Sequence, residues 1–403
     1  MAKQINNKVP KFRFKGFEGE WKEKTLGDIG DTQSGVGFPD AEQGGKTGTP
    51  FFKVSDMSRA GNDQEMLTSN NYVSDEQLRR KKWTPISDVP AVIFAKVGAA
   101  IMLNRKRLVK NPFLIDNNAM AYIFDASWDT SFGRTLFDTI NLPLYAQVGA
   151  LPSYNGSDIE SIVVHVPDNV EEQTKIGGYF REVDRLIGLQ QRKHDKLVTL
   201  KKAMLQKMFP QPGATTPEIR FKGFDCEWDG KPFNLITSRA TQSCSEENLP
   251  RLEYEDIVSN SGYLNKDLAQ KKSRKKGIRF EEGDVLFGKL RPYLKNWLLA
   301  DFEGIAVGDF WVLRSSTTAP PFLYRLIQTE AFERIANQSA GSKMPRSDWN
   351  LVSNSVFRVP SDPIEQQQIG SYFLTLDELI SKHAVQLAKL KQLKSACLEA
   401  MFV

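Results

Sequence analysis

The feature that most constrains the fold of this chain is a 44-residue segment that occurs twice. Residues 166–209 read "VPDNVEEQTKIGGYFREVDRLIGLQQRKHDKLVTLKKAMLQKMF", and residues 359–402 read "VPSDPIEQQQIGSYFLTLDELISKHAVQLAKLKQLKSACLEAMF". Aligned without a gap, 19 of 44 positions are identical. Two copies this similar predict the same structure in both halves of the chain.

A shorter phrase opens each half. "PKFRFKGFEGEW" at residues 10–21 and "PEIRFKGFDCEW" at 217–228 share eight of twelve positions. This phrase repeats after 207 residues and the long segment after 193, so the second copy is shorter between them. At the 193-residue offset, the second-copy positions of Phe94, Lys96 and Asp116 are Phe287, Lys289 and Asp309. The chain is therefore a tandem duplication whose flanks stayed alike while its middles diverged.

Each 44-residue copy predicts one long helix, over about 168–209 and 361–402. Roughly 39 helical residues span about 58 Å at 1.5 Å per residue. Apolar residues recur at alternating spacings of four and three, which is the heptad pattern of a seam between two helices. We expect an antiparallel coiled coil between the copies, and a pair of core helices in a bundle is the alternative. The expected seam residues are Ile176, Phe180, Val183, Ile187, Leu197, Ile369, Phe373, Leu376, Ile380, Leu387 and Leu390.

The diverged middles, about 22–165 and 229–358, read as α/β. "AVIFAK" and "DVLFGKL" are short apolar runs bounded by Gly and Pro, which is typical of strands, while 131–141 and 321–338 show helical periodicity. We therefore expect an α/β (α+β) fold with two α/β domains separated by the two long helices, arranged as a pseudo-two-fold tandem repeat. The expected divisions are a first domain, a central helix with the linker "PQPGATTPE", a second domain and a C-terminal helix, at 1–165, 166–216, 217–358 and 359–403.

Composition and motifs argue against several classes of function. No run of 18 apolar residues occurs and the three cysteines are scattered, which predicts a cytoplasmic protein without a zinc site. "GGKTG" (44–48) lacks the upstream glycine of a phosphate-binding loop, and "NPF" (111–113) lacks a proline of the amino-methyltransferase motif. "EWK" (20–22) becomes "EWD" in the second copy, so it does not support a metal-dependent nuclease. We expect no catalytic residues, no metal and no cofactor in this chain.

Basic residues in both middles suggest DNA. The net charge is +5, and Lys and Arg in loops neutralise phosphates, while Arg also reads guanine. A solvated surface is the alternative for each cluster. The loops at 149–154 and 341–346 are included because each precedes the strand that leads into a long helix. The candidate DNA-binding residues are Arg79, Arg80, Lys81, Lys82, Lys96, Tyr154, Lys271, Lys272, Arg274, Lys275, Lys276, Lys289, Arg291, Lys343 and Arg346.

The two "VP…EQ…IG.YF…D.LI" helices, the "GDVLFGKLRPYL" strand and the "RF.GF…EW" openings resemble the specificity (S) subunit of type I restriction-modification systems. The resemblance covers essentially the whole chain. It implies two target-recognition domains, each reading one half of a split, asymmetric DNA sequence, and helices that dock two adenine methyltransferase subunits. Restriction subunits can join through these partners. The resemblance also implies that S-adenosylmethionine, ATP and magnesium belong to the partner subunits.

Two other classes stay open from the residues alone. One is a coiled-coil scaffold whose two variable domains bind proteins. The other is a self-sufficient DNA-modifying enzyme, which the missing catalytic motifs disfavour. An adenine methyltransferase encoded beside this chain would distinguish the specificity subunit from both.

Overall fold

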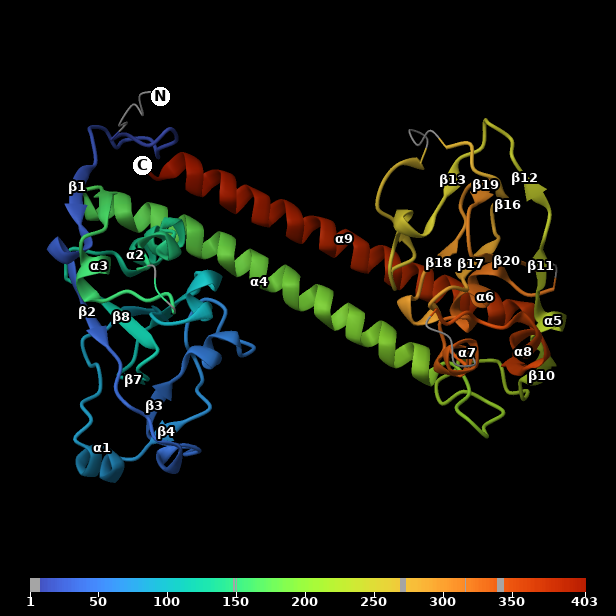
Figure 1. Ribbon diagram of the computed structural model, residues 1–403, viewed down its shortest axis with the longest axis horizontal. Coiled ribbons are helices and arrows are strands. Elements are labelled where there is room, and N and C mark those ends of the chain that lie inside the picture. Colours follow the sequence, from blue (N-terminus) through green and yellow to red (C-terminus); the bar gives the residue numbers. More distant parts are fainter. Residues whose placement is uncertain (1–7, 148, 150, 269–272, 316, 339–343) are drawn as a thin grey trace. The chain divides into compact units, whose positions relative to one another are not determined.

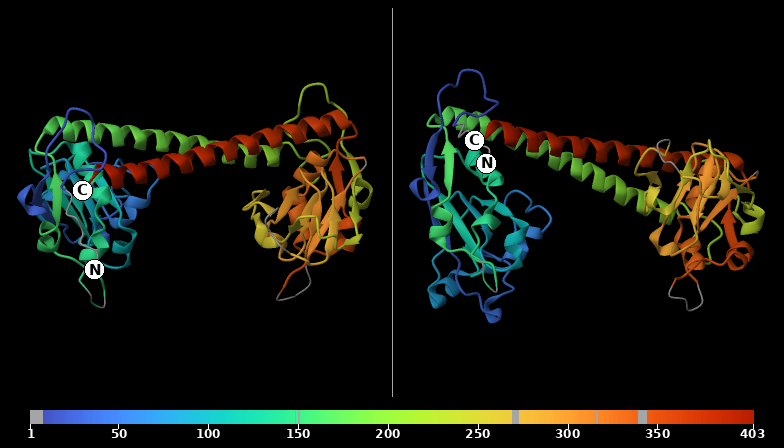
Figure 2. Two further views of the ribbon diagram at one scale, coloured as in Figure 1. Left: turned by 90° about the horizontal axis from the view of Figure 1, so that it is seen from above. Right: turned by 45° about the horizontal axis from the view of Figure 1, so that its top comes forward.

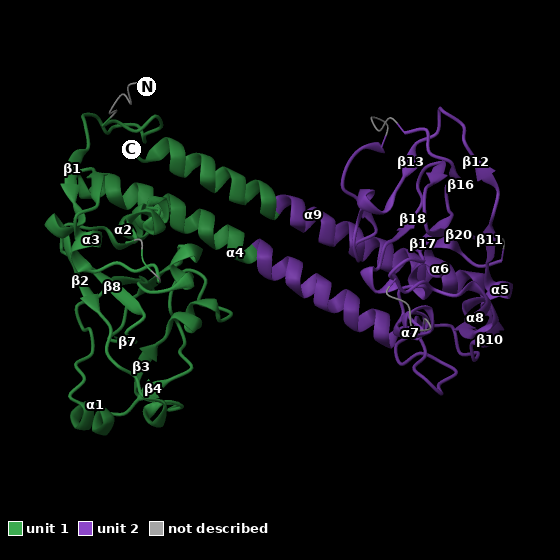
Figure 3. Cartoon of the chain, viewed as in Figure 1, with its two compact units in different colours: residues 1–189, 387–403 green, residues 190–386 purple. Residues whose placement is uncertain are grey.

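The computed structural model divides the chain into two compact units, residues 1–189 with 387–403 and residues 190–386 (Figure 3). The structure describes residues 8–147, 149, 151–268, 273–315, 317–338 and 344–403. This division differs from the domains predicted from the repeat, because each unit includes part of both long helices.

Unit 1 is built on a four-stranded antiparallel sheet (Figure 1). Its strands, in spatial order, are β2 (Gly30–Ser34), β8 (Ala119–Phe124), β5 (Ala91–Ala95) and β6 (Lys106–Val109). Because side chains alternate along a strand, β5 faces two cores. Val92 and Phe94 join the core beside the helices, while Ala91 and Ile93 join a second core on the other face. This explains why every residue of "AVIFA" is apolar.

The second core of unit 1 is closed by a smaller mixed sheet, with β3 paired parallel to β7. Its strands are β4 (Tyr72–Val73), β3 (Thr49–Phe52) and β7 (Leu114–Ile115). Helix α1 (Asp75–Lys81) follows β4 and begins at a capping box formed by Ser74 and Gln77. This part of the unit lies away from the long helices, and we call it the distal region.

Unit 2 repeats the main sheet with the same strand order. Its strands are β11 (Ser238–Ala240), β20 (Phe310–Arg314), β17 (Val285–Gly288) and β18 (Trp297–Leu299). Its distal sheet is again mixed, with β13 paired parallel to β19. The distal strands are β12 (Ser243–Cys244), β16 (Gly277–Phe280), β19 (Gly304–Ala306) and β13 (Arg251–Leu252), and a two-stranded pair, β14 (Ile257–Val258) and β15 (Tyr263–Leu264), completes the region. Two units of the same topology confirm the predicted α/β tandem repeat.

The strand registers correct one equivalence taken from the sequence. Phe94 pairs with Met120 in unit 1 and Phe287 pairs with Trp311 in unit 2. The residue that precedes β8 in unit 1 is therefore equivalent to the residue that precedes β20 in unit 2, and these residues are Asn118 and Asp309. Asp116, which the constant 193-residue offset aligned with Asp309, lies two residues earlier. The offset is not constant inside the middles because the segment between β5 and β6 is longer than the segment between β17 and β18.

Short helices and edge strands join each sheet to the long helices. In unit 1 they are β1 (Lys22–Thr25), α2 (Thr130–Thr139), α3 (Gly156–Glu160) and β9 (Val163–Val166). In unit 2 they are β10 (Asp229–Pro232), α5 (Phe233–Ile236), α6 (Pro320–Leu326), α7 (Glu330–Ala336), α8 (Trp349–Asn354) and β21 (Val356–Val359). The helix predicted at 131–141 is confirmed, but the one predicted at 321–338 is two helices. Thr329 separates them because its side chain accepts the Phe332 N–H as an N-cap.

The long helices are α4 (Val170–Lys207, 38 residues) and α9 (Pro363–Met401, 39 residues), close to the predicted bounds. In each unit one segment of α4 lies beside one segment of α9 (Figure 2). In unit 1 Asp184 pairs with Lys394, and in unit 2 Lys201 pairs with Asp377. Tyr179 contacts Cys397 in unit 1 and Gln190 contacts His383 in unit 2. Contacts that run in opposite directions along the two helices confirm the antiparallel pairing.

Candidate functional site

A buried carboxylate near the start of each long helix binds the repeated opening phrase. Glu172 accepts hydrogen bonds from Arg13 at 2.6 and 2.7 Å and from the Trp21 indole at 3.4 Å. In unit 2 Glu365 accepts from Arg220 at 2.6 and 2.8 Å and from the Trp228 indole at 3.3 Å. The hydrogen bonds to the carboxylates raise the pKa of both arginine guanidiniums. We call these two clusters the helix anchors.

The same phrase holds the end of the other long helix. The Phe12 N–H donates to Ala400 O at 2.8 Å in unit 1, and the Ile219 N–H donates to Lys207 O at 2.9 Å in unit 2. These bonds satisfy carbonyl groups that a helix C-terminus leaves without an intrahelical partner. Phe402 packs edge-on to Trp21, as Phe209 does to Trp228. Each anchor therefore joins the start of one long helix to the end of the other.

The glycine of the "IG.YF" motif lets each long helix approach its unit closely. A Cβ at Gly177 would lie 2.4 Å from the Phe132 nitrogen, and one at Gly370 would lie 2.9 Å from the Phe322 nitrogen. Both distances are shorter than real Cβ contacts, so an alanine would push the helix away. The two phenylalanines also stack on Phe402 and Phe209, respectively.

About two turns after this glycine, an ion cluster links each pair of helix segments to its unit. In unit 1 Asp184 pairs with Lys394 at 2.8 Å and with Arg134 of α2 at 3.2 Å. Burial opposes ionisation of the neighbouring Asp138, but Arg134 and Lys394 outweigh it and hold the pKa of Asp138 below its usual value. In unit 2 Asp377 pairs with Lys201 and with the fully buried Arg325 of α6, both at 2.6 Å.

The predicted seam residues are all buried or partly buried. Ile176, Phe180 and Val183 lie on the face of α4 that turns toward unit 1, and the first two belong to its main core. Ile369, Phe373 and Leu376 belong to the equivalent core of unit 2. Leu387 is buried, and Ile187, Leu197, Ile380 and Leu390 are partly buried. The heptad pattern therefore marks a face shared between the partner helix and the unit's own core.

Several candidate DNA-binding residues lie on two adjacent loops in each unit. In unit 1 Lys96 follows β5, and its carbonyl accepts the Tyr154 N–H at 3.2 Å. In unit 2 Lys289 and Arg291 follow β17, and the Arg291 N–H donates to Pro345 O at 2.7 Å, next to Arg346. The structure thus brings together Lys96 and Tyr154, which are 58 positions apart, and Arg291 and Arg346, which are 55 positions apart. Tyr154 itself is buried, and its hydroxyl donates to Ala95 O at 2.5 Å, so it supports the loop from inside.

The other basic candidates lie in the distal regions. Arg79, Arg80, Lys81 and Lys82 are exposed at the end of α1, and Glu42 pairs with Arg80 at 2.6 Å and with Lys81 at 3.2 Å. Lys275 pairs with Glu253 at 3.1 Å, and Lys276 is exposed. Lys271, Lys272 and Lys343 lie outside the described residues.

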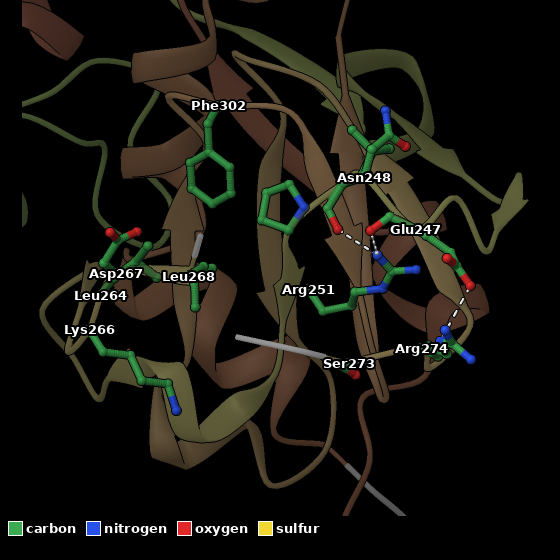
Figure 4. Close-up of a pocket in the computed structure, with 12 residues that line it drawn as sticks. Glu247, Asn248, Arg251, Leu264, Lys266, Asp267, Leu268, Ser273, Arg274 and Phe302 are labelled. Carbon is green, nitrogen blue, oxygen red and sulfur yellow. Dashed lines mark hydrogen bonds and ion pairs between the residues drawn. The ribbon is translucent and has the colours of Figure 1, made fainter. Parts of the chain in front are cut away.

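The distal region of unit 2 contains a pocket of about 680 Å³ (Figure 4). Arg251 is buried in its wall and donates to Leu249 O at 2.6 Å and to Glu247 O at 3.2 Å. Arg274 lies at its edge, 3.3 Å from the Glu247 carboxylate. The basic residues of this pocket are thus held by backbone carbonyls and acidic side chains. The lining residues are Glu247, Asn248, Leu249, Pro250, Arg251, Leu264, Lys266, Asp267, Leu268, Ser273, Arg274 and Phe302.

The described part of the chain contains neither a metal-binding cluster nor a membrane-spanning helix. No group of three or more His, Cys, Asp or Glu side chains there could hold a metal ion. No helix in these same ranges is long and apolar enough to cross a membrane.

Sequence reasoning missed the buried polar residues that organise both anchors. Glu172, Arg13, Asp184 and Lys394 were not singled out, although each is identical to its counterpart in the other copy. Glu, Asp, Arg and Lys are almost never fully buried unless they are paired. Charged residues repeated inside an otherwise apolar helix motif were therefore the signal that could have found them.

The comparisons with known proteins agree with this geometry. Residues 18–199 match the family model of the type I restriction modification DNA specificity domain. The fold is similar to that of the type I restriction-modification S subunit from M. genitalium, with a TM-score of 0.65, 13% identity and coverage of 98% of this chain and 99% of that one. A second structure, described by its role in complex assembly and conformational transition of the type I R-M system, has a TM-score of 0.51, 16% identity and coverage of 94% and 96%. No curated protein sequence matched the chain.

The matched segment contains the whole of unit 1 between the opening phrase and α4, and the second half repeats its topology and its anchor. Residues 18–199 thus match a type I restriction modification DNA specificity domain, and the second half of the chain repeats the topology of that domain. The fold of the whole chain is similar to that of a type I restriction-modification S subunit.

Proposed function

We propose that this chain directs a type I restriction-modification complex to a bipartite, asymmetric DNA sequence. Each unit reads one half-site through its distal region and the adjacent loops, and the two anchors and their helix segments dock two adenine methyltransferase subunits. The chain itself is not catalytic. S-adenosylmethionine, ATP and magnesium bind to the partner subunits. Restriction subunits join the complex through the methyltransferases, and the complex works in the cytoplasm.

One observation carries this proposal. The anchors repeat contact by contact, with hydrogen-bond lengths that agree within 0.1 Å, whereas the distal side chains differ almost everywhere. The two anchors form equal surfaces, which suit two copies of one partner. The two distal regions form unequal surfaces, which suit two different DNA half-sites.

Exposed apolar residues support two equal docking surfaces. Unit 1 exposes Leu186 of α4, Leu393 of α9 and Val163 of β9. Unit 2 exposes their exact repeat counterparts, Leu379, Leu200 and Val356. Exposed apolar residues at matched positions indicate a surface that binds protein.

Co-expression with the adenine methyltransferase subunit tests the docking. Native mass spectrometry should show two methyltransferase subunits per chain, and Leu186→Glu with Leu393→Glu should reduce this to one. Val385→Glu is the matched control, because Val385 is exposed on α9 but corresponds to Arg192 in the first copy. A wild-type chain that bound no methyltransferase and showed no salt-dependent DNA affinity would favour the protein-binding scaffold instead.

A further inference from the structure

The loops after β5 and β17 make equivalent backbone contacts but differ in charge. The Lys96 N–H donates to Asn118 O, and the Lys289 N–H donates to Asp309 O, both at 2.8 Å. An antiparallel bridge joins Val97 to Ser153, and another joins Leu290 to Arg346. Position by position, unit 1 therefore carries Lys, Gly, Asn and Ser where unit 2 carries Lys289, Arg291, Asp309 and Arg346. Unit 2 has three cations around one carboxylate, whereas unit 1 has one cation.

Asp309 organises two of these cations. Its Oδ2 accepts from Arg346 Nη2 at 2.9 Å, and its Oδ1 lies 3.6 Å from Lys289 Nζ. The backbone beneath is fixed, because the Tyr254 hydroxyl donates to Asp309 O and accepts the Leu290 N–H at 3.1 Å. Because one carboxylate is shared between two cations, the cluster keeps a net positive charge. The Arg346 side chain is 59% exposed and can meet a ligand.

Arg291 occupies a backbone conformation that suits glycine. Its φ and ψ are 49° and 61°, in the left-handed region, which is unfavourable for a residue with a side chain. The equivalent residue of unit 1 is Gly98, with a φ of 81°. The side chain of Arg291 is exposed, so packing does not explain it. A strained residue kept where glycine would fold more easily indicates that its side chain has a function.

We propose that Lys289, Arg291 and Arg346 form a preorganised binding site for DNA phosphodiester groups, with Asp309 as its positioning residue. Among the described residues unit 1 has only Lys96 at this place, so unit 2 supplies the larger share of the salt-dependent affinity. The inference rests on the proposed function and deepens it, because it assigns unequal electrostatic roles to the two half-site readers. Each phosphate neutralised by a cation steepens the plot of log affinity against log salt concentration by about 0.9.

Exchanging residues between the units tests the site. The full chain, assembled with its methyltransferase partners, is titrated with a duplex that contains the mapped target at several salt concentrations. Arg291→Gly and Arg346→Ser copy unit 1, and each should flatten the salt dependence by about 0.9. Ser153→Arg copies Arg346 of unit 2 and should steepen it by the same amount. Gly98 is left unchanged, because its φ of 81° is a conformation that strains any residue with a side chain. Arg291→Gly should not lower the melting temperature, because it relieves backbone strain.

Asp309→Asn separates positioning from charge. This variant adds a positive charge, so charge alone would tighten DNA binding, whereas loss of the positioning carboxylate should weaken it. Unchanged salt slopes in Arg291→Gly and Arg346→Ser would overturn the phosphate site. An affinity loss limited to the cognate half-site, with the slope unchanged, would also overturn it, since base reading would then explain these residues. A wild-type complex without salt-dependent DNA binding would overturn the proposed function itself.

Discussion

The helix anchors are nearly identical in the two units, whereas the loops beside the distal regions differ in their side chains. Around Glu172 and Glu365 the two units keep the same side chains, the same partners and the same hydrogen-bond lengths. At the loops that carry Gly98 and Arg291, the backbone hydrogen bonds and one lysine are kept, while the other charged residues differ. The comparison teaches that one scaffold carries a surface that must stay constant and a surface that is free to vary. Substitutions in the anchors should therefore act equally in both units.

Removing either anchor carboxylate should have the largest effect. Glu172→Ala leaves Arg13 and the Trp21 indole without their buried acceptor, and breaking a buried ion pair by removing one partner costs about 3–5 kcal/mol. Glu365→Ala should cost the same within experimental error. The free energy of unfolding, measured by denaturant titration, checks both values.

Glu182→Ala is the control for the anchor variants. Glu182 lies on the same helix as Glu172, but its ion pair with Arg185 is exposed and screened by solvent, so its loss should hardly change the free energy of unfolding. A large difference between Glu172→Ala and Glu365→Ala would break the equivalence of the two anchors.

The ion clusters should respond unequally. Asp377→Asn removes the carboxylate that pairs with both Lys201 and the fully buried Arg325. Asp184→Asn leaves Arg134 and Lys394 paired with Asp138. We expect a loss of about 3 kcal/mol for the first variant and about 1 kcal/mol for the second. Equal losses in thermal unfolding would show that Asp138 does not compensate.

Lys106 should make unit 1 sensitive to pH. Burial lowers the pKa of Lys106 to about 8, although Asp138 opposes the shift, and its amine donates to Ile140 O at 2.6 Å. The strand register places Trp297 at this position in unit 2. Between pH 8 and 10 the unfolded chain holds a proton that the folded chain has released, so stability rises with pH in this window.

The variant Lys106→Met should remove this rise, which is on the order of 1–3 kcal/mol. Melting temperatures of the wild type and the variant between pH 7.5 and 9.5 measure the difference. A wild type whose stability falls relative to the variant over this range would contradict the prediction.

The long helices and the tandem architecture could be predicted because the repeat is dense in identical residues with a regular apolar spacing. The helix at 131–141 could also be predicted from its regular apolar spacing, because its apolar face is continuous. The break at Thr329 was missed because a capping side chain interrupts the helix without disturbing its apolar pattern. Local hydrogen bonding then outweighs periodicity.

The candidate site could be predicted only in part. Lys96 and Lys289 were found because each follows a recognisable strand. Asp309 was matched to the wrong residue. A few matched positions in the sequence do not show where unit 1 contains its two extra residues. The buried partners Asp184 and Asp377 depend on contacts with residues far along the chain, which no local pattern contains.

The central claim is that each unit reads its own half-site on a constant anchor. Its most direct test replaces residues 26–162 with a second copy of residues 233–355, joining the segments where β1 and β9 match β10 and β21. The variant is expressed with its methyltransferase partners, and methylated sites are mapped across a genome. We predict that the half-site of unit 1 disappears and that the half-site of unit 2 occurs twice in the new target. Methylation of the original bipartite sequence by this variant would contradict the account.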